Sequence, residues 1–189
     1  MDNKAPGQAA ALGDAVTKSA TQVQSIYLDQ LQRANQIRAD EAANQLKEAE
    51  LDLTFGENGY LRHKGRDALF RPCGKSLTQE YGDEFDKRSA EIMGGLSNDS
   101  QREAFQRVSG GMGTQMRGRV DQHFETQFGV YNASVNEGII KNQTNAIGLN
   151  WADPDATDAA VLSTRGAVYN RATLTGRHST EEIEADTKA

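Results

Sequence analysis

The sequence predicts an all-α protein of long helices, arranged as elongated hairpins or a bundle that is completed by oligomerisation. Three observations lead to this fold class. Proline is rare, so two long stretches of the 189-residue chain contain none. Within those stretches apolar residues recur at steps of three and four, the period of an α-helix. The apolar stripes are narrow, which is typical of helices that pack against other helices.

The first predicted element is one long amphipathic helix that fills residues 1–54. Its stripe is rich in alanine, whereas the rest of its surface is polar and charged, which favours a seam against another helix over a deep globular core. The stripe consists of Leu12, Val16, Ala20, Val23, Tyr27, Leu31, Ala34, Ala42, Leu46, Ala49 and Leu53. We expect Val16, Val23, Tyr27 and Leu31 to make helix-packing or oligomer contacts.

Residues 55–76 break this pattern because they contain four glycines and Pro72, so a structured loop is expected. Ser76 precedes Gln79 by three residues, the spacing of a capping box, in which each side chain satisfies a backbone N–H at a helix start. A helix is therefore predicted to follow, with an apolar stripe of Leu77, Tyr81, Phe85 and Ile92. The glycine pair at 94 and 95 should end it, since glycine accepts the left-handed conformation of a helix C-terminus.

A second long helix is predicted from an N-cap at Asn98 to about Leu149. A cluster of four of its glycines, at 110, 111, 113 and 118, lies in the first half of this helix, and each costs up to about 1 kcal/mol relative to alanine. We expect a kink or a close backbone approach there, which would divide the helix in two. The residues expected to make packing or oligomer contacts are Phe105, Met112, Val120, Phe124, Phe128 and Tyr131.

Asp153 and Pro154 are predicted to open a further helix that closes near Gly176, because proline favours the first turn of a helix. Residues 77–176 would then form a helical bundle region. Ser179 and Glu182 repeat the capping-box spacing shortly before the chain ends at Ala189. Residues 177–189 are therefore expected to begin another helix, as in a fragment of a longer protein.

The length of the predicted helices favours oligomerisation. A helix of about fifty residues is ~75 Å long, whereas a compact globule of this chain length has a radius of gyration of only ~16 Å. Such helices must project, and a projecting apolar stripe needs another helix to cover it.

The composition excludes several classes of protein. The 21 basic and 27 acidic residues give a net charge of −6, and the basic residues are scattered, so a duplex DNA-binding face is not expected. Cys73 is the single cysteine, which excludes an intrachain disulfide and a site of several thiolates. We find neither the pattern of a secretion signal nor the ~20 continuous apolar residues of a membrane span, although an amphipathic face could still meet a membrane.

Two short motifs resemble ligand-binding loops, but each lacks an essential residue. The glycine-rich run at 110–118 has no Lys-Ser/Thr ending and follows a helix, so we interpret it as a helix kink and not as a phosphate loop. The run from Asp153 supplies the first carboxylates of a calcium loop, but Asp158 and Thr164 replace its glycine and glutamate. Helix capping explains that run better.

No catalytic residue, cofactor site or metal site is predicted. The three histidines, at positions 63, 123 and 178, are too far apart in sequence to form a zinc pair on one helix and are expected at the surface or in packing. Cys73 has no identifiable base, and Glu57 is expected to be a solvated carboxylate. Trp151, the single tryptophan, is expected to anchor a turn.

The order of several segments is similar to that of a known family. These segments are FGENGYLRHKGRDAL, LTQEYGDEFDKR, GGLSNDSQREAFQRV, NASVNEGIIKNQTNAIGLNWADP and GAVYNRATLTGRHSTEEIEADT, all between residues 51 and 189. Together they resemble the N-terminal part of the large internal virion proteins, or ejection proteins, of short-tailed bacteriophages and their prophage relatives. The alanine-rich helix before residue 51 lies outside the resemblance.

The resemblance implies a structural protein without a cofactor, stored inside the capsid near the portal and the tail axis. Copies of the chain would assemble with one another and with portal, tail or sister ejection proteins. They would then form a conduit across the host envelope and periplasm, through which DNA passes without sequence-specific binding. Long helices with few prolines and no disulfide suit a chain that must straighten, pass a channel and pack again.

Three other classes of function are considered. A tail adaptor, scaffold or tape-measure-like protein would also consist of long helices. A non-catalytic part of a larger peptidoglycan-degrading virion enzyme is the second alternative, and a Glu and a His meeting in a cleft near residues 55–76 would favour an enzyme. A nucleic-acid-binding module is the third, and it would bind in a salt-dependent manner.

Overall fold

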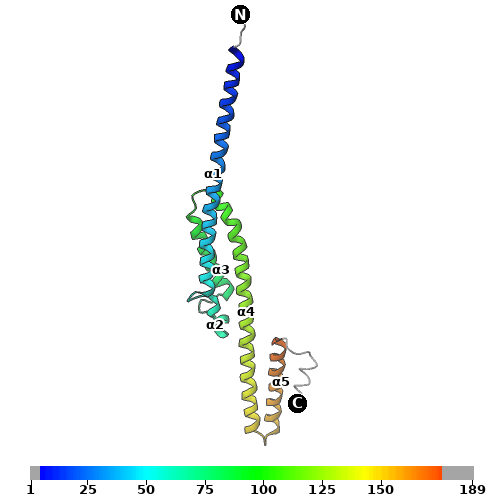
Figure 1. Cartoon of the computed structure of the whole chain (residues 1–189). Helices are drawn as coiled ribbons and strands as arrows, with labels where there is room; N and C mark the ends of the chain where they lie inside the picture. Colours follow the sequence, from blue (N-terminus) through cyan, green and yellow to red (C-terminus); the bar gives the residue numbers. More distant parts are fainter. Residues whose placement is uncertain (1–4, 176–189) are drawn as a thin grey trace. The chain divides into compact units, whose positions relative to one another are not determined.

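The computed structural model of the chain describes residues 5–175, with side chains at Lys18 and from Thr21 to Thr173. The predicted all-α class is confirmed, because the described residues form helices and no strand. The elements are α1 (Ala5–Phe55), the 3-10 helix η1 (Tyr60–Arg62), α2 (Arg66–Leu69), α3 (Leu77–Gly94), α4 (Asp99–Leu149) and α5 (Pro154–Thr175), as Figure 1 shows. None of these helices, over the part that is described, combines the length and apolarity that crossing a bilayer requires. The predicted helix start at Ser179 lies outside the described residues.

The chain forms two compact units, Met1–Glu50 with Phe85–Thr114 and Leu51–Glu84 with Gln115–Ala189. The first unit contains most of α1, the second half of α3 and the beginning of α4. Its buried apolar side chains are Ala39, Ala42, Leu46, Phe85, Leu96 and Phe105. The three from α1 are spaced by three and four residues, which places them on one face of that helix.

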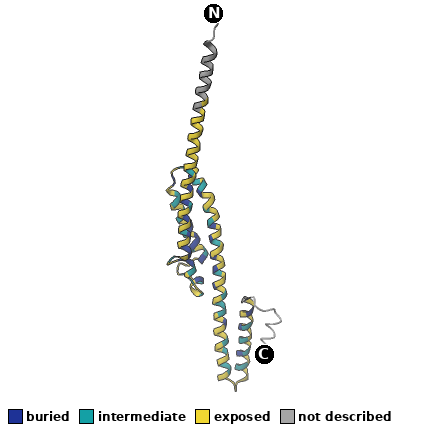
Figure 2. Ribbon diagram, in the orientation of Figure 1, coloured by how far each residue is buried: buried dark blue, intermediate teal, exposed yellow. Residues whose placement is uncertain are grey.

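Within the first unit, the turn between α3 and α4 is bound to α1 at Asn35. Asn98 Oδ1 accepts the N–H of Gln101 at 3.0 Å, as expected of an N-cap. The side-chain amides of Asn98 and Gln101 both donate to Asn35 Oδ1, each at 3.0 Å. Residues 5–34 of α1 therefore extend past this turn over roughly 45 Å. Every described residue from Thr21 to Ala34 is exposed, as Figure 2 shows.

In the second unit, α3 begins with the predicted capping box. Ser76 Oγ accepts the N–H of Gln79 at 3.1 Å, and the Gln79 side chain accepts the N–H of Ser76 at 3.2 Å. The predicted start of α5 is also confirmed, because Asp153 Oδ1 accepts the N–H of Ala156 at 3.1 Å. α5 lies beside the last part of α4, as Figure 1 shows. Its alanines at positions 160, 167 and 172 are buried.

The predicted division of α4 into two helices is wrong, because α4 is one uninterrupted helix from Asp99 to Leu149. A Cβ atom added at Gly110, Gly111 or Gly118 would meet nothing within 4 Å, so no close backbone approach occurs at these positions. Glycine carries an energetic cost in a helix but can still adopt helical dihedral angles, and the flanking helical residues maintain the hydrogen-bond ladder.

Candidate functional site

The residues predicted to make helix contacts differ widely in exposure. Phe105 and Val120 are buried, and Met112, Phe124 and Tyr131 are half-buried. The exposed members are Val23 at 67%, Tyr27 at 63%, Leu31 at 46% and Phe128 at 39%. The side chain of Val16 lies outside the described residues. Three of the four exposed residues lie on α1, which makes that helix the first candidate for an interaction surface.

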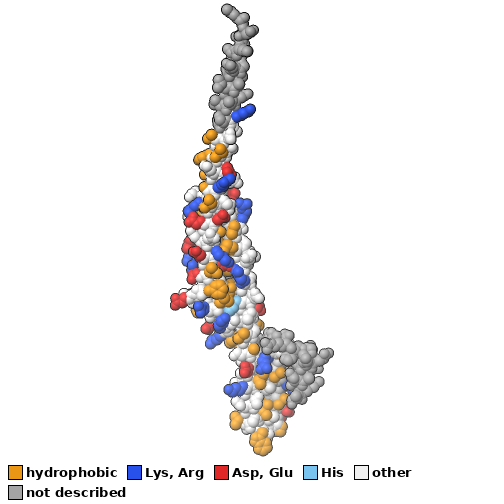
Figure 3. Space-filling model, in the orientation of Figure 1, with side chains coloured by type: hydrophobic (Ala, Val, Ile, Leu, Met, Phe, Trp, Pro, Cys, Tyr) orange, Lys and Arg blue, Asp and Glu red, His pale blue; other side chains and the backbone are white. Residues whose placement is uncertain are grey.

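Some of the exposed apolar residues of α1 form a face separate from its buried face, whereas Leu28 and Leu31 lie on the same side of the helix as the buried residues. At 100° per residue, Val23, Ile26, Gln30, Ala34 and Ile37 fall on one side of the helix, which we call the outer face. This outer face lies roughly 150° around the helix from the buried residues at positions 39, 42 and 46. Figure 3 shows orange apolar side chains on the exposed stretch of α1 next to the grey residues. The stripe predicted from the sequence contained Val23 and Ala34 of the outer face but neither Ile26 nor Ile37, so the sequence pattern did not identify this face.

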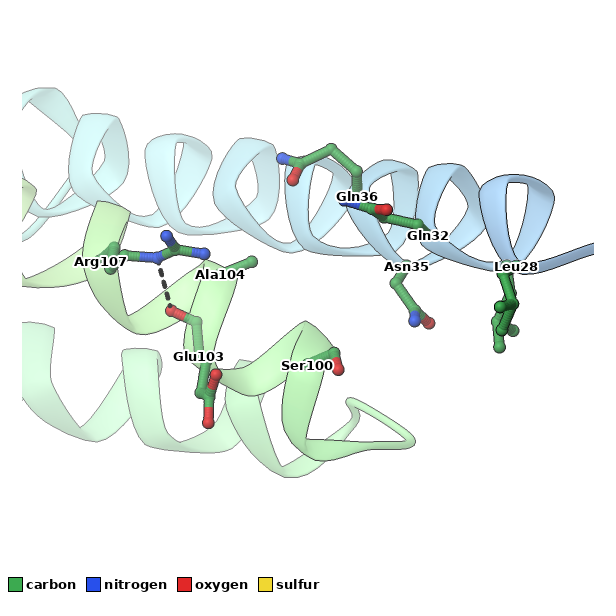
Figure 4. A pocket seen from close by; sticks show the side chains of 9 residues that line it. Leu28, Gln32, Asn35, Gln36, Ser100, Glu103, Ala104 and Arg107 are labelled. Carbon is green, nitrogen blue, oxygen red and sulfur yellow. Dashed lines mark hydrogen bonds between the residues drawn. The ribbon is translucent and has the colours of Figure 1, made fainter. Parts of the chain in front are cut away.

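On the opposite side of α1 from the outer face, in the direction of its buried residues, α1 and the start of α4 enclose an open groove of about 360 Å³ (Figure 4). Its apolar lining comes from Leu28, Leu31 and Ala104, whereas Asn35, Arg107 and other polar side chains complete it. Arg107 Nε also donates to the backbone oxygen of Glu103 at 3.4 Å. The mixed lining and the open shape suit a helix or a side chain of another protein better than a small molecule, which favours a concave and mostly apolar site.

The second unit contains a polar network that the sequence did not predict, which we call the His63 cluster: His63, Arg71, Glu80 and Tyr81. Arg71 binds Glu80 through two hydrogen bonds, Nε to Oε2 at 2.7 Å and Nη2 to Oε1 at 3.0 Å. Arg71 Nη1 also lies 2.8 Å from His63 Nδ1, and His63 Nε2 lies 2.8 Å from Tyr81 Oη. These contacts join residues 63 and 71 of the loop to the first turns of α3.

The donors and acceptors of the network determine the protonation state of His63. Arginine can only donate, so Nδ1 accepts from Arg71 and the ring proton resides on Nε2, which donates to Tyr81 Oη. Tyr81 in turn donates to the backbone oxygen of Asn58 at 2.5 Å. Burial, followed by the nearby Arg71 charge, lowers the pKa of His63 from its ordinary value of 6.5. Hydrogen bonding to Arg71 lowers the pKa of Glu80.

α4 binds the same loop through two further hydrogen bonds within the second unit. The ring of His123 donates from Nε2 to the backbone oxygen of His63 at 2.9 Å. Gln127 Oε1 accepts the N–H of Gly65 at 2.8 Å, and Gly65 has a φ of +48°, which favours glycine. The ring of Tyr60 contacts those of Tyr81 and His123 edge-on, with centroids 5.8 and 5.6 Å away. The network thus binds the loop to both helices.

The His63 cluster is better suited to hold the loop than to transfer protons. A general base needs an accessible lone pair, but the Nδ1 lone pair of His63 is occupied by Arg71. Glu80 is likewise held by Arg71 and accepts a weak hydrogen bond from the exposed Cys73 thiol at 3.4 Å. A Glu and a His therefore do lie near the loop, but an arginine separates them. Among the described residues, no group of three or more His, Cys, Asp or Glu side chains could hold a metal ion.

The expectation that Trp151 anchors the turn between α4 and α5 is wrong. Its side chain is 81% exposed, and the neighbouring Leu149 is 83% exposed. The turn is formed instead by polar groups, because Thr157 Oγ1 donates to the backbone oxygen of Asn150 at 3.0 Å and the N–H of Asp153 donates to the same oxygen at 2.9 Å.

Comparison of the chain with protein-family models, curated proteins and solved structures finds no match.

Proposed function

We propose that this chain is a structural virion protein of a bacteriophage, an internal core or ejection protein that assembles with other copies at the portal and tail axis. In this proposal it has no enzymatic activity and takes no cofactor. Together with other virion proteins, it helps to form a conduit that delivers the genome across the host envelope, and DNA passes without sequence-specific binding.

The observation that carries the assembly part of the proposal is the uncovered stretch of α1. From Thr21 to Ala34 each residue is exposed, including Val23, Ile26 and Tyr27. A helix without tertiary contacts is only marginally stable in water, and apolar side chains along it favour association. Covering this stretch with another chain removes both problems, which is why we favour an assembled protein.

The virion part of the proposal rests on the resemblance of segments between residues 51 and 189 to phage ejection proteins. The His63 cluster is compatible with a structural role, because its hydrogen bonds are directed at one another and at the loop backbone. In the described residues, no buried side-chain nitrogen or oxygen lacks a hydrogen-bond partner. A catalytic site would instead be expected to keep a polar group available for substrate.

Sedimentation velocity of the full chain over a wide concentration range tests assembly. We expect a concentration-dependent shift from monomer to larger species. A chain that stays monomeric at high concentration and unfolds as one cooperative two-state domain would contradict the proposal.

The location in the particle tests the virion part. Mass spectrometry should detect the chain in full particles of the phage that encodes it and should find it lost from particles that have released their DNA. A tail adaptor would remain with the emptied particles, and a scaffold would already be missing from the full ones. Cryo-electron microscopy of full particles should place the chain on the portal axis.

A further inference from the structure

The outer face of α1 has a palindromic pattern. Its five residues follow one another at steps of three, four, four and three, with Gln30 at the centre and an apolar residue at each of the other positions. Val23 and Ile37 lie at equal distances from Gln30, and so do Ile26 and Ala34. A surface that must match a copy of itself through a two-fold axis needs this kind of symmetry.

We propose that the outer face of α1 binds the outer face of a second copy of the chain in an antiparallel helix pair, with the two-fold axis at Gln30. This inference rests on the self-assembly in the proposed function and specifies its surface and geometry. Val23 of each copy packs against Ile37 of the other, Ile26 packs against Ala34, and the two Gln30 side chains meet at the centre. The large residue of each pair faces a smaller one, or one of similar size, so the side chains can interdigitate.

The first unit leaves room for this pair. Residues 39, 42 and 46 of α1 are buried on the opposite side of the helix, roughly 150° away. On the outer face, by contrast, Val23 is 67%, Ile26 52% and Ile37 66% exposed. A second copy can therefore approach the outer face without displacing α3 or α4 from the first unit.

The charges beside the outer face favour the antiparallel orientation. Asp29 and Arg33 form an ion pair at 2.9 Å along one edge of this face. A two-fold axis perpendicular to the helices places this edge against the same edge of the second copy, with Arg33 about 3 Å along the axis from the level of the other Asp29. The two ion pairs then form an alternating group of four charges, which favours association.

A parallel pair is disfavoured by Glu41, which lies on the continuation of the outer face just after Ile37. In parallel register, Glu41 would face its own counterpart in the second copy, and two like charges in direct opposition are destabilising. In the antiparallel pair the two Glu41 side chains are about 33 Å apart along the helix axis. The apolar part of the outer face thus ends at Ile37, which is the last residue that is paired in an antiparallel overlap centred on Gln30.

Disulfide cross-linking of the full chain tests the orientation. Cys73→Ser removes the native thiol, and Val23→Cys or Ile37→Cys is then introduced into separately tagged chains. We expect cross-linked dimers in the mixture of the two variants and at most a tenth of that yield in either variant alone. Cross-links in each variant alone, with none specific to the mixture, would show a parallel pair and overturn the proposal.

Sedimentation of the same variants before oxidation separates this inference from the proposed function. A chain that assembles but gives no cross-link at either position assembles through another surface, which overturns the inference and leaves the proposed function standing. A chain that remains monomeric overturns both. As a further readout, Ile26→Asp should abolish association, whereas Leu162→Asp, at a position 72% exposed on α5, should leave it unchanged.

Discussion

Truncation of Ile37 to alanine offers a quantitative test of the outer face. Complete burial of an isoleucine side chain contributes about 1.5–3 kcal/mol. Ile37 is 66% exposed in the single chain, so about 1–2 kcal/mol per side chain remains to be gained from a partner. A two-fold interface contains the residue twice, and alanine retains Cβ, so we expect Ile37→Ala to weaken the pair by about 2–3 kcal/mol. The dissociation constant should rise roughly 30- to 150-fold.

Sedimentation equilibrium over a concentration series measures this dissociation constant for the natural chain and the variant. Leu162→Ala is a matched control, because it removes the same number of carbon atoms at a position 72% exposed on α5 and should leave the constant unchanged. Circular dichroism should show that α1 remains helical at concentrations where the variant is paired. A change below threefold for Ile37→Ala, or an equal change for the control, would refute the argument that the outer face carries the association.

Three further perturbations test the packing and the polar network. Phe105→Ala should lower the free energy of unfolding by about 3–5 kcal/mol, because Phe105 is 0% exposed. Phe128→Ala should lower it much less, because Phe128 is 39% exposed. Urea titration of the two variants compares these free energies. Ser76→Ala removes the side-chain oxygen that caps α3 and should lower the free energy of unfolding by about 1 kcal/mol. The melting temperature should therefore fall, and an unchanged melting temperature would show that the cap does not stabilise the chain. Because the folded chain holds His63 neutral with a lowered pKa, stability should be full above about pH 6.5 and fall as the pH drops below that value. His63→Gln should flatten this pH dependence, measured by thermal unfolding between pH 7.5 and 5.5. An unchanged slope would contradict the role assigned to His63. Glu80 does not affect this pH range, because the stability that it contributes is lost only below about pH 4.5.

The helix starts could be predicted because they depend on neighbours in the chain. Ser76 with Gln79, Asn98 with Gln101 and Asp153 with Ala156 each form a hydrogen bond across three residues. Such contacts are present in the sequence pattern itself, whatever packs around them. The length of α1 and the all-α class could be predicted for a similar reason, because apolar residues that recur at the helical period over many positions indicate an α-helix.

The division of α1 into two faces could not be predicted from steps of three and four alone. Between Ala34 and Ala42 the predicted stripe advances by eight residues, which turns its direction by roughly 80° around the helix. Ala42, Leu46 and Leu53, after this step, are buried, whereas Val23, Tyr27, Leu31 and Ala34, before it, are exposed. Only the packing of the first unit shows where one face ends and the other begins.

The His63 cluster also arises only in the tertiary structure. Its contacts join residues 18 apart for His63 and Tyr81, nine apart for Arg71 and Glu80, and 60 apart for His123 and the His63 carbonyl. No periodicity links such positions, and the loop sequence indicated only that regular helix stops there.

By itself, the sequence determined the helical class, the helix starts and the absence of an intrachain disulfide, because these follow from backbone preference, local capping and residue identity. The tertiary structure alone decided which side of α1 is covered, which polar groups hold the loop and whether the glycines of α4 interrupt it. Those outcomes depend on contacts between residues distant in the chain, whose energies are set by burial and hydrogen-bond geometry and are not encoded in any local pattern.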